Sequence, residues 1–207
     1  RYKYMKRIST LCLTLLTAII AFAATPTAES ILGSMRKSML AKPAVEAKFT
    51  INGGQGPVQG TICIEGAKFA MATPQLKVWY DGKTQWTYLA STGEVSITEP
   101  TADELAASNP FAILSGYETR YKARKLTDSN SRRRVELQPR AKDTGFEKII
   151  VIADTAGKWP QAINIYFDDG RQISLVIDHI TGAAKQPAKL FRYDPKLQPA
   201  SEIIDLR

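Results

Sequence analysis

The sequence predicts a mainly β protein: an antiparallel sheet of about 11 strands with two short helical interruptions. Apolar and polar residues alternate with a period of two through most of the chain, which is the pattern of half-buried strands. Turn-forming Gly, Asp, Asn and Pro residues separate these runs at short intervals. Strands and helices do not alternate, so a parallel sheet is not expected. A long antiparallel sheet curls or closes, because strands twist and sheet edges need protection.

The beginning of the chain has the features of a secretory signal peptide. Lys6-Arg7 follow Met5, and the run from Ile8 to Ala24 is largely apolar. We expect Met5 to be the start of the protein. Ala21-Phe22-Ala23 then supplies a small-x-small cleavage pattern. We expect residues 1–23 to be removed after export and residues 24–207 to form a single domain. The alternative is an uncleaved membrane anchor.

The charge and cysteine content limit the classes of function. Four of the 28 basic residues lie in the first seven positions, and without them the net charge falls from +8 to +4. A mildly basic domain does not indicate nucleic-acid binding. After cleavage Cys63 is the one remaining cysteine, so no intramolecular disulfide is expected. We interpret Cys63 as a small, buried strand residue.

The first part of the domain predicts one helix and two strands. Apolar residues recur at helical spacing from Ile31 to Ala41, and Pro43 ends the helix. The period then changes to two over residues 45–51 and 58–65, which a glycine-rich turn separates. The apolar stripe of the helix must pack against the sheet. It consists of Ile31, Leu32, Met35 and Met39.

The stretch from Lys68 to Tyr88 predicts a short strand and a β-hairpin, and it holds two of the three Trp residues. Asp81-Gly82 joins two apolar-rich runs, which is a strong hairpin signal. Aromatic residues flank this turn on both sides, and such side chains suit a half-buried pleated surface. A shift of one residue in register would exchange the two faces, so the sequence leaves the inward-facing aromatic residues undecided.

A broken, partly helical insertion interrupts the strands after residue 100. Thr101 and Glu104 have the spacing of a capping box, and Asn109-Pro110 stops the helix that they would begin. The apolar residues Phe111 and Leu114 follow. One strand, at residues 94–97, precedes the insertion. Further strands are expected after it, at 117–126, 132–138, 147–153, 162–167, 172–178 and 189–193.

No group of residues in the sequence has the pattern of a catalytic or metal site. The chain holds a single histidine, His179, and a lone histidine is usually structural or solvent-exposed. It contains neither a nucleophile motif nor a phosphate-binding loop. One Cys and one His cannot build a zinc site. We therefore expect no enzyme activity, no cofactor and no metal.

Two neighbouring basic runs form a candidate docking patch at one end of the sheet. A turn at residues 128–131 brings the two runs together. One interpretation is a solvated strand face whose charges protect a sheet edge. The other is docking on an acidic partner or an anionic membrane surface. The patch consists of Lys122, Arg124, Lys125, Arg132, Arg133 and Arg134.

The apolar side of the sheet allows two interpretations. If side chains fill its interior, it is an ordinary hydrophobic core; if part of the interior stays open, it is a ligand cavity. Periodicity does not separate these alternatives. The candidate wall residues come from the strands and from the insertion. They are Phe49, Ile62, Ile64, Phe69, Leu76, Val78, Trp86, Tyr88, Phe111 and Leu114.

An ordered set of segments resembles the LolA family, the periplasmic carriers that move lipoproteins between the two membranes of Gram-negative bacteria. Asp81-Gly82-Lys83-Thr84-x-Trp86-x-Tyr88 is similar to the family's DGKTxWxY hairpin. The helix after the signal peptide, AVEAKFTI, EVSITEP, the Asn109-Pro110-Phe111 insertion and the ending FRYDPKLQP…IIDLR match in the same order. The resemblance implies an incomplete antiparallel barrel with a helical lid over an apolar cavity.

The resemblance also implies a function and partners. A carrier of this kind receives the acyl chains of a lipoprotein from an inner-membrane lipoprotein-releasing ABC transporter. It passes them to an outer-membrane acceptor and acts in the periplasm without catalysis. We expect a monomer that binds acylated lipoproteins and no nucleic acid. The alternative is a lipid- or lipoprotein-binding sensor module on the same fold.

One departure from the family concerns the lid. Better-known members carry an Arg before the strand that corresponds to Phe69, and this Arg ties the lid to the sheet when the cavity is empty. The corresponding stretch here, Ile64 to Phe69, has no Arg. Lys68 could replace it only in part, because Lys lacks the planar fork that bridges several carbonyls.

Overall fold

The computed structural model describes residues 25–54, 56–101, 104–105, 109–142 and 144–207. The predicted signal peptide, residues 1–23, lies outside these ranges. No helix of the described ranges is long and apolar enough to cross a membrane.

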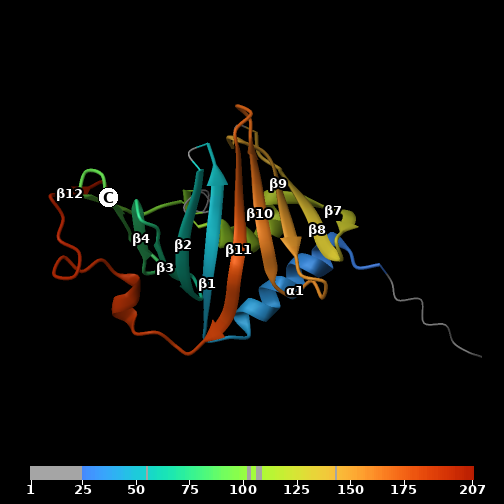
Figure 1. The fold of residues 1–207 in the computed structure, drawn as a ribbon, viewed down its shortest axis with the longest axis horizontal. Helices are drawn as coiled ribbons and strands as arrows, with labels where there is room; N and C mark the ends of the chain where they lie inside the picture. Colours follow the sequence, from blue (N-terminus) through green and yellow to red (C-terminus); the bar gives the residue numbers. More distant parts are fainter. Residues whose placement is uncertain (1–24, 55, 102–103, 106–108, 143) are drawn as a thin grey trace, which may run out of the picture.

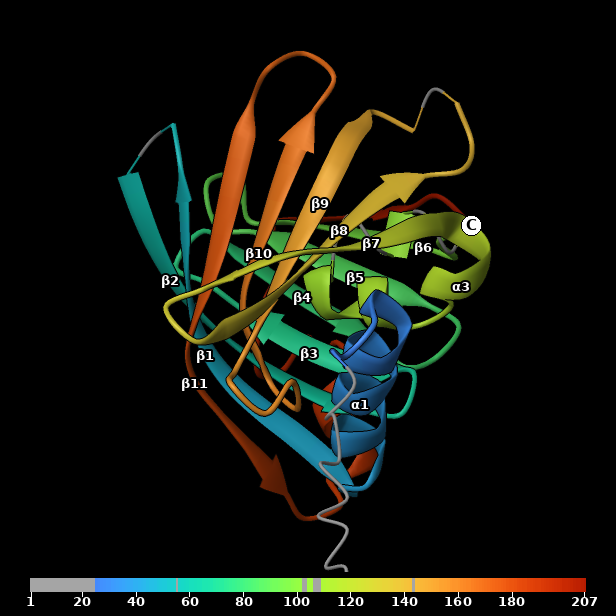
Figure 2. The same ribbon diagram turned by 90° about the vertical axis from the view of Figure 1, so that its right-hand side faces the viewer.

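One curved sheet of 12 strands forms the body of the molecule (Figures 1 and 2). The order is β12-β6-β5-β4-β3-β2-β1-β11-β10-β9-β8-β7, and the sheet is not closed. All neighbours are antiparallel except β12 and β6, which are parallel. The predicted fold class, a mainly β incomplete barrel, is confirmed. The strands are β1 (Ala44–Gly53), β2 (Gly56–Glu65), β3 (Lys68–Ala72), β4 (Leu76–Tyr80), β5 (Gln85–Leu89), β6 (Glu94–Thr98), β7 (Tyr121–Ser129), β8 (Arg132–Pro139), β9 (Phe146–Ala153), β10 (Pro160–Phe167), β11 (Gln172–Ala183) and β12 (Glu202–Asp205).

The helix α1 (Ala28–Leu40) lies against the concave side of the curved sheet (Figure 2). It begins three residues earlier than predicted, because the Thr27 hydroxyl caps it by accepting the Ser30 N–H at 3.2 Å. Ile31, Leu32 and Met35 are buried on its inner face. The apolar stripe read from the sequence is therefore the face that packs on the sheet.

The insertion after β6 contains the 3₁₀ turn η1 (Pro110–Leu114) and the short helix α3 (Tyr117–Arg120). The predicted capping box is present: Thr101 N–H donates to Glu104 Oε2 at 2.7 Å, and Glu104 N–H donates to Thr101 Oγ1 at 3.4 Å. The Asn109 side chain accepts the Phe111 N–H and so begins η1. We call α1 and η1 together the lid.

Two apolar clusters fill the concave side. The lid-side cluster joins α1, η1 and α3 to the inner faces of β7–β10. The sheet-side cluster joins Phe111 to the inner faces of β1–β4 and β11. Met39, near the end of α1, packs against both. The space between the two clusters is therefore bounded by the lid and by the sheet.

Two predicted strands differ from the structure, and one strand was not predicted. Residues 117–120 form α3 where a strand was expected, since Gly116 takes a left-handed conformation (φ 69°) and starts a turn. Residues 188–191 form the 3₁₀ turn η2 (Ala188–Phe191) instead of a final strand. Residues 202–205, for which the sequence predicts no element, form the strand β12, which pairs with β6. We call residues 184–201, which connect β11 to β12, the strap.

Candidate functional site

An apolar cavity of about 390 Å³ lies between the lid and the sheet. Met39 and Leu40 line it from α1, Val45 and Ile64 from β1 and β2, and Tyr80 from β4. Leu105, Phe111 and Leu114 line it from the insertion, and Arg36, Lys42 and Asn109 supply polar atoms. The volume falls within the range of about 300–1,000 Å³ that is usual for small-molecule sites. The lining favours an apolar ligand.

The register of the strands decides which predicted wall residues face this side. Phe69 pairs with Ile64 and Tyr80, and Met71 pairs with Ile62 and Val78, so these side chains share one face. Ile64, Phe111, Leu114 and Met39 line the cavity directly. The other predicted residues on this side pack in the sheet-side cluster behind it. They are Phe49, Ile62, Phe69, Leu76 and Val78.

Trp86 and Tyr88 do not join this wall. Trp86 pairs with Trp79, and Tyr88 pairs with Lys77, so these four side chains share one face. Val78 and Tyr80 alternate with Lys77 and Trp79 along β4 and therefore point to the other face. The two aromatic residues therefore lie on the outer face of the sheet. The expectation that they share a wall with Phe69 and Val78 is wrong, because period-two alternation alone leaves the choice of inner face open.

The strap covers the outer face beside these aromatic residues. The Tyr193 ring lies 5.7 Å from the Trp79 ring, and Phe191 is fully buried. The Lys68 ammonium lies 5.7 Å from the centre of the Phe191 ring. Burial of apolar surface by the strap thus accounts for aromatic residues of the hairpin that do not face the cavity.

Sequence reasoning missed several residues that line the cavity: Leu40, Val45, Tyr80 and Leu105. The signal was present for two of them. Tyr80 continues the Leu76–Val78 alternation, and Val45 continues the Ala47–Phe49 alternation. Leu40 ends the helix α1, beyond the predicted stripe, and Leu105 lies in the insertion, where the sequence shows no regular period.

Two polar contacts hold α1, one of them at the border of the cavity. Arg36 of α1 forms an ion pair with Glu118 of α3 at 3.3 Å. The Tyr117 hydroxyl donates to the Glu29 carbonyl at 3.3 Å. Both contacts join α1 to α3.

A guanidinium group does bind lid carbonyls, but it comes from a different position than the family pattern implied. Arg120 Nη2 donates to the Ala112 carbonyl at 3.1 Å and to the Ser115 carbonyl at 2.6 Å. Lys68 forms an ion pair with Glu65 and points to the outer face, whereas the next residue of β3, Phe69, points to the inner face. Lys68 therefore does not contact the lid, and Arg120 fastens η1 to the start of β7.

Replacing Arg120 with Lys is expected to loosen η1, because the shorter Lys side chain does not bring its ammonium to the position of Nη2, which donates to both carbonyls. We expect a loss of about 1 kcal/mol in the free energy of unfolding, and faster amide exchange over residues 110–116. Arg140→Lys is the matched control, since Arg140 Nε donates to the Tyr121 carbonyl at 2.9 Å and does not reach η1. Equal exchange rates in η1 for both variants would contradict the assignment.

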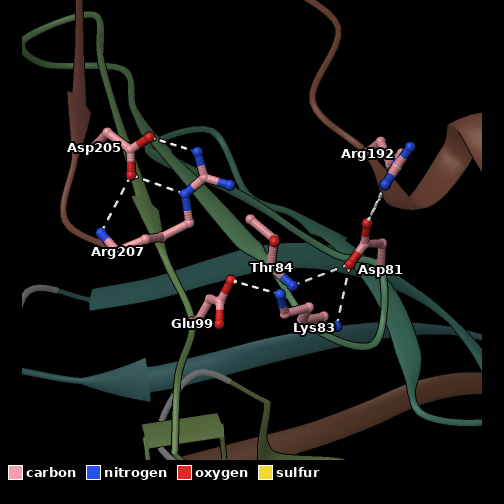
Figure 3. Close-up of polar contacts among 7 residues, drawn as sticks. All are labelled: Asp81, Lys83, Thr84, Glu99, Arg192, Asp205 and Arg207. Carbon is pink, nitrogen blue, oxygen red and sulfur yellow. Dashed lines mark hydrogen bonds and ion pairs between the residues drawn. The ribbon is translucent and has the colours of Figure 1, made fainter.

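The Asp81 turn is tied to the strap on the outer face (Figure 3). Four residues, not two, separate β4 from β5. Asp81 Oδ1 accepts the N–H groups of Lys83 and Thr84 at 3.1 and 3.0 Å, and Arg192 lies 2.8 Å from Oδ2. Burial opposes ionisation, but these hydrogen bonds and the guanidinium outweigh it and hold the pKa of Asp81 below its ordinary 3.8. The DGKT segment is thus a structural turn.

Asp81→Asn keeps a side-chain acceptor for the turn and removes the ion pair with Arg192. We expect a loss of about 1 kcal/mol at neutral pH. Because the folded pKa is depressed, the wild-type advantage is present above pH 3.8 and is lost as the pH falls through the folded pKa. Urea unfolding at several pH values measures it. Glu99→Gln is the control: the exposed Lys83–Glu99 pair should contribute under about 0.5 kcal/mol.

The predicted docking patch is divided between the two faces of the β7–β8 hairpin. Along β7, Lys122 and Arg124 lie on one face and Lys125 lies on the other. Arg124 pairs with Glu136 at 2.9 Å on the outer face, whereas Lys125 and Arg133 both pair with Asp128. Arg134 lies opposite Leu126, and Arg132 lies at the turn. The patch is therefore a charged hairpin with cations on both sides.

A second, larger hollow of about 770 Å³ lies on the outer face. Its border carries charged and polar side chains, among them Lys48, Lys77 and His179. Cys63 lies in its floor, and burial, then Glu46 and Glu65, raise the pKa of this thiol to about 11. The thiol is therefore not activated. Among the described side chains no group of three or more His, Cys, Asp or Glu could hold a metal ion.

These features define a class: an incomplete antiparallel barrel with a helical lid over an apolar cavity. The family model described as outer membrane lipoprotein carrier protein LolA matches residues 23–169. The chain belongs to this family. A search of curated proteins finds no match.

Solved structures with a similar fold come from several bacteria. One is an uncharacterized conserved protein from Thermus thermophilus, with a TM-score of 0.60 and 12% sequence identity. The match covers 86% of this chain and 98% of the Thermus chain. Another is a LolA superfamily protein from Nitrosomonas europaea, with a TM-score of 0.44 and 11% sequence identity. The match covers 82% of this chain and 99% of the Nitrosomonas chain. At such identities the likeness to the Thermus protein concerns the fold alone.

Proposed function

We propose that the protein is an exported periplasmic carrier that shields the acyl chains of lipoproteins and moves them from the inner to the outer membrane. The observation that carries the proposal is the apolar cavity between lid and sheet. Membership of a family named for lipoprotein carriers supports it. Its action is binding and release, without chemistry on the cargo.

The physical reason for such a carrier is the cost of exposed acyl chains. Each CH₂ group left in water costs about 0.8 kcal/mol relative to burial, so an acylated protein does not cross an aqueous space unshielded. Met39, Ile64 and Phe111 offer apolar contacts to a chain, while Arg36 and Lys42 can face its polar end.

The proposed partners are those of a transfer route. An inner-membrane lipoprotein-releasing ABC transporter would load the carrier, and an outer-membrane acceptor would unload it. The carrier would act as a monomer, independent of nucleic acid, metal or cofactor. Export through the predicted signal peptide, residues 1–23, would place it between the two membranes.

Purification from the native host followed by mass spectrometry tests the cargo. We expect co-purifying acylated peptides, and an empty cavity in every preparation would count against the proposal. Depletion in the same host tests transport. Acylated proteins should then accumulate in the inner membrane. Normal arrival at the outer membrane, combined with an altered stress response, would favour the sensor function instead.

A further inference from the structure

The strand β7 is an edge of the 12-stranded sheet (Figures 1 and 2). On one side it pairs with β8 in continuous register from Tyr121 to Leu126. On the other side, no strand of the described part of the chain pairs with it. The Arg140 N–H donates to the Arg120 carbonyl, so in the alternating antiparallel pattern the backbone groups of Ala123 and Lys125 point away from β8 and can accept an added strand. The Tyr121 carbonyl on the same side already accepts from Arg140 Nε.

The net positive charge of the domain is concentrated in this hairpin. Residues 121–139 contain six basic residues and two carboxylates, Asp128 and Glu136, a net charge of +4. The chain from residue 24 onward has the same net charge of +4, because four of the 28 basic residues precede it. The remainder of the domain thus carries no net charge.

Both faces of the hairpin have unneutralised cations. On the outer face Lys122, Arg124 and Arg134 accompany the single carboxylate of Glu136. On the inner face Lys125 and Arg133 share Asp128. Within the described residues Lys122, Arg132 and Arg134 form no ion pair.

We propose that the β7 edge binds an extended acidic segment of a partner protein by strand addition. The side chains of an added strand alternate between the two faces, so acidic residues on it would meet cations on both. A flat anionic membrane would touch one face alone. Like charges also oppose pairing of β7 with a second copy of itself, which makes the edge selective for an acidic strand.

This inference is independent of the cavity and concerns a protein partner. The probe is a short synthetic peptide in which pairs of adjacent Glu residues are separated by Val and Thr, so that Glu lies on both faces of the added strand. Its binding is measured by fluorescence anisotropy with the full chain. We expect saturable binding that weakens as the salt concentration rises. Bound peptide should also slow amide exchange within Lys122–Leu126.

Two variants and a modified peptide separate strand addition from general attraction. Lys122→Glu/Arg132→Glu should weaken binding about tenfold. Lys189→Glu/Lys196→Glu changes the net charge equally at exposed positions in the strap region and should have little effect. A peptide methylated at two neighbouring backbone nitrogens keeps its charge, loses donors on both edges, and should not bind.

Three results would overturn the proposal. The first is equal binding of the methylated peptide, which would indicate charge attraction without backbone pairing. The second is equal weakening by both double variants. The third is binding to phosphatidylglycerol vesicles through Lys122 and Arg132 without peptide binding, which would indicate a membrane surface. Loss of lipid binding by a cavity variant with peptide binding intact would separate this site from the carrier function.

Discussion

Ile64→Trp is expected to reduce acyl-chain binding more than about tenfold, corresponding to roughly 1.4 kcal/mol. Ile64 points to the inner face beside Val45 and Phe69 and lines the cavity of about 390 Å³. An indole at this position would occupy space that the ligand needs. A fluorescent fatty-acid probe, titrated into wild type and variant, measures the change.

Ile152→Trp is the control for this prediction. Ile152 is half-buried in β9 and pairs with Arg134 and Ala162 on the outer face, away from the cavity. The control should bind the probe as wild type does. If both variants bind equally well, the acyl chain does not enter this cavity, whatever the family membership implies.

Gly60→Ala is expected to destabilise the protein by about 1–3 kcal/mol, as overpacking of a close contact does. The Phe49 ring of the neighbouring strand lies over Gly60, and a Cβ there would sit 2.4 Å from its Cζ and 3.0 Å from the Ala72 carbonyl oxygen. The ring is buried within the sheet-side cluster and cannot move without disturbing it. Urea unfolding measures the loss.

A double-mutant cycle identifies the cause of the loss. Phe49→Leu removes the atoms that meet the new Cβ, so the double variant should lose less stability than the sum of the two single variants. Gly53→Ala, in the same hairpin with open space around it, should change stability by under about 0.5 kcal/mol. Additive losses in the cycle would show that the ring is not the obstacle.

Local sequence patterns predicted the elements well where each element depends on its own residues. The alternation in β1 and the regular turns of β8–β11 specify strands independently of their neighbours. The helical stripe of α1 and the Thr101–Glu104 capping box were predicted for the same reason. The segment at 117–120 was missed because a left-handed Gly116 precedes it, and nothing in the strand pattern signals that turn.

The candidate site was only partly predictable, because a cavity arises between elements far apart in sequence. Phe111, Leu114 and Met39 were recognised as apolar, and the fold then brought them to Ile64. Trp86 and Tyr88 are also large aromatic residues, but they lie on the other face of the sheet. The sequence does not indicate the role of Arg120, since this role depends on where the Ala112 and Ser115 carbonyls lie in space.

The sequence by itself determined that this is a mainly β antiparallel protein with one amphipathic helix and a LolA-like order of segments. Periodicity and turn residues are local properties, so they can be read directly from one amino-acid sequence. The tertiary structure alone decided which face of the DGKT hairpin is inward, where the lid leaves space, and that the basic residues lie on a sheet edge. Each of these depends on strand register and strand order, which are set by the packing of segments distant along the chain.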